Sequence, residues 1–428
     1  MNSEERKVAL HKLMKAHEPC RTGNPIMYKG VRKELPAYRI PLEYLIYNPY
    51  NGRIGSVVKS YERQYHELNP EVKEDKDLIE KFLMESKPEA NKVTRRRLLA
   101  EHQQQLGIVT SAGIIIDGNR RAMLLNDIMK DKSIEYSAKA HCKYFDAIIL
   151  PDDMDKKDIL ALETTYQMGE DAKVDYDPIE KYLKSKDLYS EGFFYEDIAG
   201  FMDIEPSEVK SMLSVLQLMD DYLDTYGYDG IYTQLDKRED KFIRLDIALK
   251  KYKAGVSTMW DYDPEGDVSD LRMIAFDYIR AQFENNPFRS IITAPTGKNQ
   301  ATSFFAQKDI WEAFRDSHMD MVDDVKEETV EEIMKTNPLN LSRRLKVRDT
   351  QWAQKIDEEL QGNYGNSLDK LKNKSELGKP LALLIKACQA LEVIDVELPS
   401  FTGDKKIKDY VSAIDNRICG FKKLLGIE

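Results

Sequence analysis

The fold is decided by the stretch Ile114-Ile115-Ile116-Asp117-Gly118-Asn119-Arg120-Arg121-Ala122-Met123-Leu124. Three β-branched residues in a row predict a buried strand, and the apolar run from Ala122 to Met129 predicts a helix. Between them, Gly118 and Asn119 predict a tight turn. Arg120 and Arg121 therefore lie on the first residues of the helix, where backbone N–H groups are unpaired and the helix dipole favours an anion.

Two adjacent arginines at the start of a helix suit the recognition of phosphate. A guanidinium forms planar, two-pronged hydrogen bonds with phosphate oxygens, and a helix N-terminus is itself an anion site. The motif predicts a phosphate site of nucleotide or polynucleotide type. The alternative is an ordinary helix start whose arginines pair with neighbouring carboxylates.

Composition limits the kinds of partner that the chain can have. A chain of 428 residues is expected to form about two or three domains. Its net charge of −11 argues against a general polyanion-binding surface, so any contact with DNA must be a local patch. The four cysteines form no CxxC pair, which predicts a reducing cytoplasm and no zinc site. A charged N-terminus and the lack of a long apolar run predict a cytoplasmic protein without membrane association.

The order of predicted elements divides the chain into three parts and predicts the α+β class. Residues 1–150 read as a small mixed α/β domain, with a helical insertion at about 56–93. Residues 151–235 read as a helical domain and residues 236–428 as a helical C-terminal region whose role the sequence does not indicate.

Within the first part, the pattern predicts a helix over residues 2–16 and a loop around Pro19, Gly23 and Pro25. It then predicts β character from Tyr38, and a strand from Leu45 that ends in the turn 48–53. A helix from Thr94 to Leu106 is expected to end at Gly107, followed by a hairpin (108–110 and 114–116) and a strand over 145–150.

The same order of pieces resembles the ParB N-terminal-like domain of the ParB/sulfiredoxin superfamily. The features that carry the likeness are the Asn48-Pro49-x-Asn51-x-Arg53 turn, the hairpin, and the Gly-x-Arg-Arg turn with its helix. The likeness covers about residues 38–220. It implies that Gly118, Asn119, Arg120 and Arg121 contact the phosphates of CTP or ATP and that Arg53 approaches the same pocket. It also implies that Gly107 and Thr110 lie near the base or ribose.

Two departures from the family pattern limit the expected chemistry. ParB proteins usually carry Glu where this chain has Asn119, and sulfiredoxin carries its catalytic Cys there, so sulfiredoxin chemistry is not expected. An amide cannot accept a proton as a general base, which leaves slow hydrolysis at most. The family also implies a Mg²⁺ ligand, for which Glu163, with Gln167 four residues later, is the nearest match. The alternative for Glu163 is a solvated helix face.

Residues 194–209 have the spacing of a helix-turn-helix, with Pro206 opening the second helix. The polar residues at its start, Ser207, Lys210 and Ser211, are the candidates for DNA contact. Acidic residues outnumber basic ones in this segment. A structural or protein-binding helix pair is therefore the alternative.

The C-terminal region carries no motif of known function. An acidic run over residues 320–332 precedes the basic run from Ser342 to Arg348, and pairing between the two is the favoured interpretation. The apolar run from Leu381 to Ala387 suits a buried helix or a contact in a homo-oligomer.

Taken with the resemblance, these features predict a ParB-like, nucleotide-binding switch that associates with DNA in partition, regulation or a mobile-element or defence system. Its ligands would be CTP or ATP with Mg²⁺. The alternatives are a small-molecule phosphotransferase of the same fold, which needs a carboxylate base, and a non-catalytic interaction protein that has lost its ligand.

Overall fold

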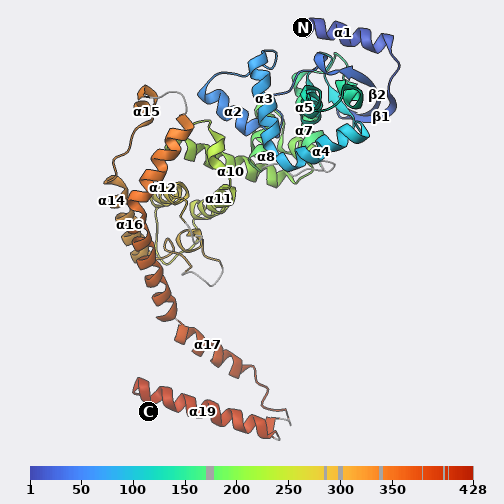
Figure 1. Cartoon of the computed structure of the whole chain (residues 1–428). Coiled ribbons are helices and arrows are strands. Elements are labelled where there is room, and N and C mark those ends of the chain that lie inside the picture. Colours follow the sequence, from blue (N-terminus) through green and yellow to red (C-terminus); the bar gives the residue numbers. More distant parts are fainter. Residues whose placement is uncertain are drawn as a thin grey trace.

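The computed structural model describes residues 1–169, 178–283, 287–296, 302–336, 341–377, 379–398, 401–402 and 404–427. A small mixed sheet surrounded by helices forms the N-terminal part, and helices form nearly all of the rest (Figure 1). The predicted α+β class is therefore confirmed. None of the described helices is both long enough and apolar enough to span a bilayer.

Five strands form one sheet in the order β1-β2-β5-β3-β4. Neighbouring strands are antiparallel except β3 and β5, which run parallel. The strands are β1 (Arg21–Tyr28), β2 (Val31–Pro41), β3 (Gly107–Val109), β4 (Ile115–Asp117) and β5 (Tyr144–Ile149).

Strands β4 and β5 carry consecutive apolar residues because both faces of the sheet are covered. Side chains alternate between the faces of a strand, so Ile115 joins the core on one side and Ile116 the core on the other. Ile148 and Ile149 on β5 divide in the same way. A run of consecutive β-branched residues is the expected sequence for such a doubly covered strand.

Helices of the N-terminal part cover one face of the sheet. They contribute Leu10, Val58, Ile79, Leu98 and Leu124 to a single core. These helices are α1 (Ser3–Ala16), α2 (Gly55–Gln64), α3 (Lys73–Ser86), α4 (Pro88–Glu101), α5 (Asn119–Lys130) and α6 (Tyr136–Lys139), with the short 3-10 turns η1 (Leu42–Tyr44) and η2 (Ala140–Lys143). The predicted helical insertion at 56–93 corresponds to α2, α3 and the first part of α4.

Three local predictions in this part are wrong. The predicted loop around Pro19 to Pro25 is instead the beginning of a hairpin, because β1 pairs with β2 over their length. The strand predicted from Leu45 is reduced to one bridge between Ile46 and Ile114. The helix before the motif ends at Glu101, not Leu106, and Gly107 begins β3, where a Cβ would lie 2.2 Å from the ring of Phe145.

The other face of the sheet is covered by α7 (Lys156–Met168), which contacts β1 and β4. Beyond it, the helical part contains α8 (Pro178–Ser190), α9 (Tyr195–Met202), α10 (Pro206–Thr225), η3 (Tyr232–Leu235), α11 (Glu239–Lys253), α12 (Gly266–Arg280), α13 (Phe288–Ile291), α14 (Lys308–Asp323), α15 (Val330–Thr336) and α16 (Leu341–Leu377). One hydrophobic core joins residues from Ile179 to Tyr364. The predicted domain boundary at residue 235 lies within this core.

The predicted helix-turn-helix is formed by α9 and α10. Ile198, Ala199, Met202 and Val209 are buried together between the two helices. Asp203 closes α9 in a left-handed conformation with a φ of 55°. A turn of three residues then leads to Pro206, the first residue of α10.

Charge pairing joins the acidic and basic runs of the C-terminal region, as predicted. Arg344 lies 3.2 Å from Glu328, and Arg348 lies 3.5 Å from Glu327. Beyond the core, α16 continues into α17 (Lys379–Glu392) and α19 (Lys405–Leu425), which extend away from the rest of the chain (Figure 1).

Candidate functional site

The predicted strand, tight turn and helix are formed by β4, Gly118 and α5. Gly118 adopts a φ of 104°, a left-handed conformation that side chains disfavour. A Cβ at this position would lie 2.6 Å from the ring of Phe145 and 3.1 Å from the guanidinium of Arg121. Glycine is therefore required both by the backbone and by the space around it.

Replacing Gly118 with alanine is expected to lower the free energy of unfolding by about 2–4 kcal/mol, because left-handed strain and overlap with Phe145 add together. Chemical denaturation would measure the change. Gly192→Ala is the matched control, since Gly192 has a φ of 83° but open space around it. Gly192→Ala should lower the free energy of unfolding by about 1–2 kcal/mol, from the left-handed backbone alone. Equal decreases in the two variants would contradict the close approach of Phe145 to Gly118.

Next to this turn lies a pocket of about 480 Å³ whose walls carry four arginines. Arg120 and Arg121 come from α5, Arg53 from the turn before α2, and Arg97 from α4. The acidic residues in the lining are Glu101 and Asp117. The excess of positive charge around one cavity is notable in a chain of net charge −11.

Both arginines of α5 are held by neighbouring residues. Arg121 donates to the carbonyl oxygens of Gln105 (2.8 Å) and Leu106 (3.1 Å) and forms an ion pair with Asp117 at 2.7 Å. It therefore anchors the start of the hairpin as well as lining the pocket. Arg120 donates to the hydroxyl of Thr94 at 3.2 Å.

Arg97 is exposed and has no carboxylate within 4.0 Å in the described part of the chain. The nearby Arg95 is instead paired with Asp127 on α5 and with Asp131, the residue that follows α5. These ion pairs hold α4 against α5. They leave Arg97 as the member of the arginine run that faces the pocket.

Asn119 connects two segments of the backbone. Its side-chain oxygen accepts from the backbone N–H of Asn48 at 2.9 Å, and its amide nitrogen donates to the carbonyl of Ile115 at 3.0 Å. The residue is buried, although it also contributes to the lining of the pocket. The amide thus ties the Asn-Pro turn, which carries Arg53, to the strand that carries the motif.

Glu163 is the centre of a buried polar network. Its carboxylate accepts from the side chains of Asn48 and Gln167, each at 3.1 Å, and forms an ion pair with Lys184 at 3.1 Å. Gln167 in turn donates to the carbonyl of Ile116 and accepts from the N–H of Gly52. Burial raises the pKa of Glu163, while Lys184 opposes that rise.

This environment does not fit a Mg²⁺ ligand. Glu163 is only 3% exposed, and it does not contribute to the pocket lining. Its oxygens already accept from an ammonium and two amides, whereas Mg²⁺ requires oxygen ligands and keeps several waters. In the described part of the chain, no group of three His, Cys, Asp or Glu side chains is arranged to hold a metal ion. The metal role of Glu163 stays a prediction without support from this geometry.

The remaining predicted residues lie away from the pocket. Thr110 is buried at the hairpin turn, where its hydroxyl accepts from the N–H of Ile114 at 3.1 Å. Ser207, Lys210 and Ser211 lie exposed on the first turns of α10. Lys210 lies over the ring of Tyr195, 5.2 Å from its centre.

Several lining residues were not identified from the sequence. They include Arg97 and Thr94 from α4, His102, Gln104 and Gln105 from the segment before β3, and Tyr166 from α7. The run Arg95-Arg96-Arg97 was visible in the sequence, but three consecutive residues point in different directions around a helix. Only the packing of α4 against α5 selects the one that faces the pocket.

Comparisons with protein-family models, with curated proteins and with solved structures found no match to this chain.

Proposed function

We propose that the arginine-lined pocket binds the phosphates of a nucleoside triphosphate, CTP or ATP, and that the chain is a ParB-like nucleotide switch associated with DNA. The observation that carries the proposal is the convergence of Arg53, Arg97, Arg120 and Arg121 on one cavity. These residues come from three separate segments, so their approach depends on the fold. Such a cluster holds like charges together and is stabilised by an anionic ligand.

The size of the pocket suits a ligand of this class. Its volume of about 480 Å³ falls within the range of small-molecule sites, about 300–1,000 Å³. Arg120 lies beside the first turn of α5, where the helix dipole also favours phosphate. Uncharged lining residues such as Gln104 and Tyr166 offer hydrogen-bonding groups for a base or ribose.

The same pocket is poorly equipped for hydrolysis. At the phosphate turn, Asp117 is paired with Arg121, and the amide of Asn119 is engaged at both ends. Glu101, the last residue of α4, is the lining carboxylate without an ion pair among the described residues. A general base needs an available proton acceptor near the attacking water. We therefore propose that the nucleotide acts mainly by being bound, and that any hydrolysis is slow.

A bound nucleotide would act as a switch through the turn at residues 48–53. This turn carries Arg53 into the pocket and is tied by Asn48 and Gly52 to the Glu163 network on α7. The network continues through Lys184 to α8, which contacts α9 and α10 of the helix-turn-helix. Ligand-dependent movement of the turn would bias the position of these helices.

A thermal-shift screen with CTP, ATP, GTP and UTP tests the proposal, with and without Mg²⁺ and double-stranded DNA. One triphosphate is expected to raise the melting temperature, and DNA is expected to raise it further, because each ligand stabilises the state that it binds. The Lys210→Ala variant should keep the nucleotide shift and lose the DNA effect if α10 contacts DNA. A screen without any nucleotide shift would instead favour an interaction protein that has lost its ligand.

We further propose that the chain is a homo-oligomer that assembles through α17 and α19. Alternating steps of four and three residues separate the apolar side chains of α19 at Ile407, Val411, Ile414, Ile418, Phe421 and Leu425. This is the repeat of a two-stranded coiled coil. No residue of α19 is buried over its described length, so the apolar stripe lies uncovered in the single chain.

The double variant Ile414→Glu/Phe421→Glu is expected to abolish self-association, because it introduces charges into the apolar stripe. Sedimentation velocity over a range of protein concentrations would measure the change. Ser412→Glu on the opposite side of the helix is the control and should assemble as the unchanged chain does. A chain that sediments as a monomer at every concentration would rule out this role for α19.

A further inference from the structure

A second and larger cleft lies in the helical part of the molecule. It has a volume of about 900 Å³ and is lined by η3, the segment leading into α11, the end of α12 and one side of α16. It is distinct from the arginine-lined pocket, because no residue lines both. Its volume also falls within the range of small-molecule sites.

Four cationic side chains that line this cleft form no ion pair among the described residues. Lys237 and Arg238 lie just before α11, Lys241 lies in its first turn, and Lys346 comes from α16. Among the described residues, none of the four has a carboxylate within 4.0 Å; Arg238 donates instead to the hydroxyl of Tyr222 at 2.8 Å. The group is therefore a local concentration of positive charge in an acidic protein.

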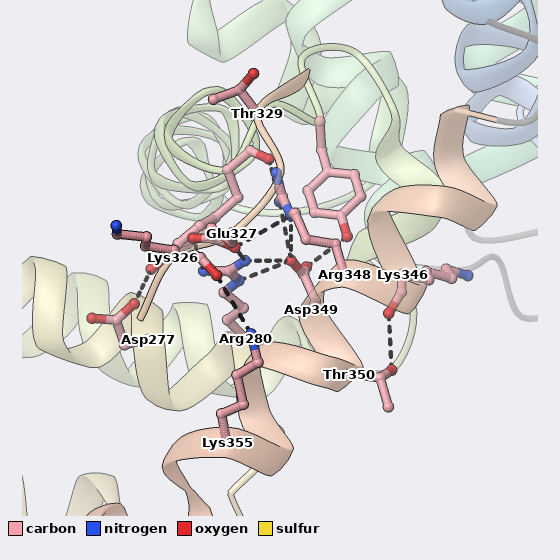
Figure 2. Close-up of polar contacts among 12 residues, drawn as sticks. Asp277, Arg280, Lys326, Glu327, Thr329, Lys346, Arg348, Asp349, Thr350 and Lys355 are labelled. Atoms are coloured by element: carbon pink, nitrogen blue, oxygen red, sulfur yellow. Dashed lines mark hydrogen bonds and ion pairs between the residues drawn. The ribbon is translucent and has the colours of Figure 1, made fainter. Parts of the chain in front are cut away.

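The cleft also contains three acidic residues, and only one of them, Asp349, is ion-paired among the described residues. Asp349 is fully engaged in the floor, where Arg280 and Arg348 form ion pairs with it and Tyr228 donates to it. Figure 2 shows this network on one side of α16, with the side chain of Lys346 pointing away from it. Asp236 and Asp357 also line the cleft, and they form no ion pair within the described part of the chain.

Two features of residues that line the cleft agree with an anion site. Burial and the nearby charge of Arg238 lower the pKa of Lys241, as expected for an ammonium among like charges. Lys237 and Gln282, which both line the cleft, adopt left-handed φ angles of 61° and 53°. Strained backbone at non-glycine residues often occurs where a ligand is held.

We propose that this cleft binds a small phosphorylated molecule. Its phosphate oxygens would accept from Lys237, Lys241 and Lys346, and Asp236 and Asp357 would accept from hydroxyl groups of the same ligand. The floor formed by Arg280 and Asp349 is already neutralised and is rigidly connected, so it supports the site without competing for the phosphate. The site is independent of the nucleotide proposed for the arginine-lined pocket.

The cleft is tested by isothermal titration calorimetry with inorganic pyrophosphate. The full chain carries Arg120→Ala, which serves as the background protein because this change weakens phosphate binding in the arginine-lined pocket. Pyrophosphate is expected to bind, and Lys237→Ala/Lys346→Ala should weaken it by at least about tenfold, since each lysine contributes a charged hydrogen bond. Both lysines are exposed, so the variant should fold. Lys251→Ala/Lys253→Ala, at the opposite end of α11, is the matched control and should bind as the background does.

Amine labelling followed by mass spectrometry gives a second readout. Pyrophosphate should slow the labelling of Lys241 in the background protein and leave that of Lys251 unchanged. Binding that is equally strong in the two lysine variants, or no binding at millimolar pyrophosphate, would overturn the proposal. The result is separable from the proposed nucleotide function, because CTP and ATP binding to the unaltered chain is measured independently.

Discussion

Replacing Arg120 with alanine is expected to weaken the binding of CTP or ATP by about 100-fold, because the change removes two charge-assisted hydrogen bonds to phosphate. Arg120 lines the pocket from the first turn of α5 and donates to the hydroxyl of Thr94 at 3.2 Å. Isothermal titration calorimetry at fixed ionic strength would measure the affinity, and circular dichroism would confirm the fold.

The three consecutive arginines of α4 provide the controls. Arg97→Ala should weaken nucleotide binding by about tenfold, because Arg97 lines the pocket. Arg96→Ala should have no effect, because Arg96 is exposed and does not line it. If Arg120→Ala and Arg97→Ala bind the triphosphate as tightly as the unaltered chain, the pocket is not the nucleotide site.

Arg121→Ala is a less specific test. Arg121 anchors Gln105, Leu106 and Asp117, so its removal is expected to destabilise the hairpin as well as to weaken binding. Measuring nucleotide affinity and stability for both Arg120→Ala and Arg121→Ala separates a loss of binding from a loss of stability.

Replacing Asp349 with alanine is expected to lower the free energy of unfolding by about 3–5 kcal/mol, because it leaves two buried guanidiniums without their shared carboxylate. Asp349 accepts from Arg280 at 2.7 and 2.9 Å and from Arg348 at 3.0 Å, and its second oxygen accepts from Tyr228 at 2.5 Å (Figure 2). Both arginines are buried. Glu327 alone would then have to neutralise them.

Urea denaturation of the variant and of two controls would measure this effect. Asp357→Ala removes a carboxylate from the same helix where it is exposed and has no ion pair within the described residues, so it should change stability by less than about 0.5 kcal/mol. Tyr228→Phe removes one hydroxyl and should cost about 1–2 kcal/mol. A loss from Asp349→Ala no larger than that from Asp357→Ala would show that the network does not stabilise the helical core.

The parts of the fold with strong local signals were predictable from the sequence. Of the predicted strand, Ile115 and Ile116 lie in β4, and Gly118 and the apolar run after it form the turn and α5. The spacing of residues 194–209, with Pro206 at the start of the second helix, predicted the helix pair that α9 and α10 form. In both cases the signal is contained within about 20 residues, so that no distant segment is needed to interpret it.

The failures occurred where distant segments decide the local structure. The hairpin of β1 and β2 was read as a loop because Pro25 and Gly23 are turn-forming residues, yet β2 is held by β5 more than 100 residues later. Gly107 was read as a helix cap, although the reason for glycine there is the ring of Phe145. The role of Arg97 likewise depends on which side of α4 packs against α5.

Arg53 has a position that gives the chain a means of communication between cavities. Its side chain lines the arginine-lined pocket and also a second cavity of about 420 Å³ between α2, α3 and η3. That cavity in turn shares Thr233, Asp236 and Lys346 with the cleft beside α11. A ligand in the arginine-lined pocket and a ligand in the 420 Å³ cavity would therefore both contact the guanidinium of Arg53, and each would change the affinity of the other by the same factor.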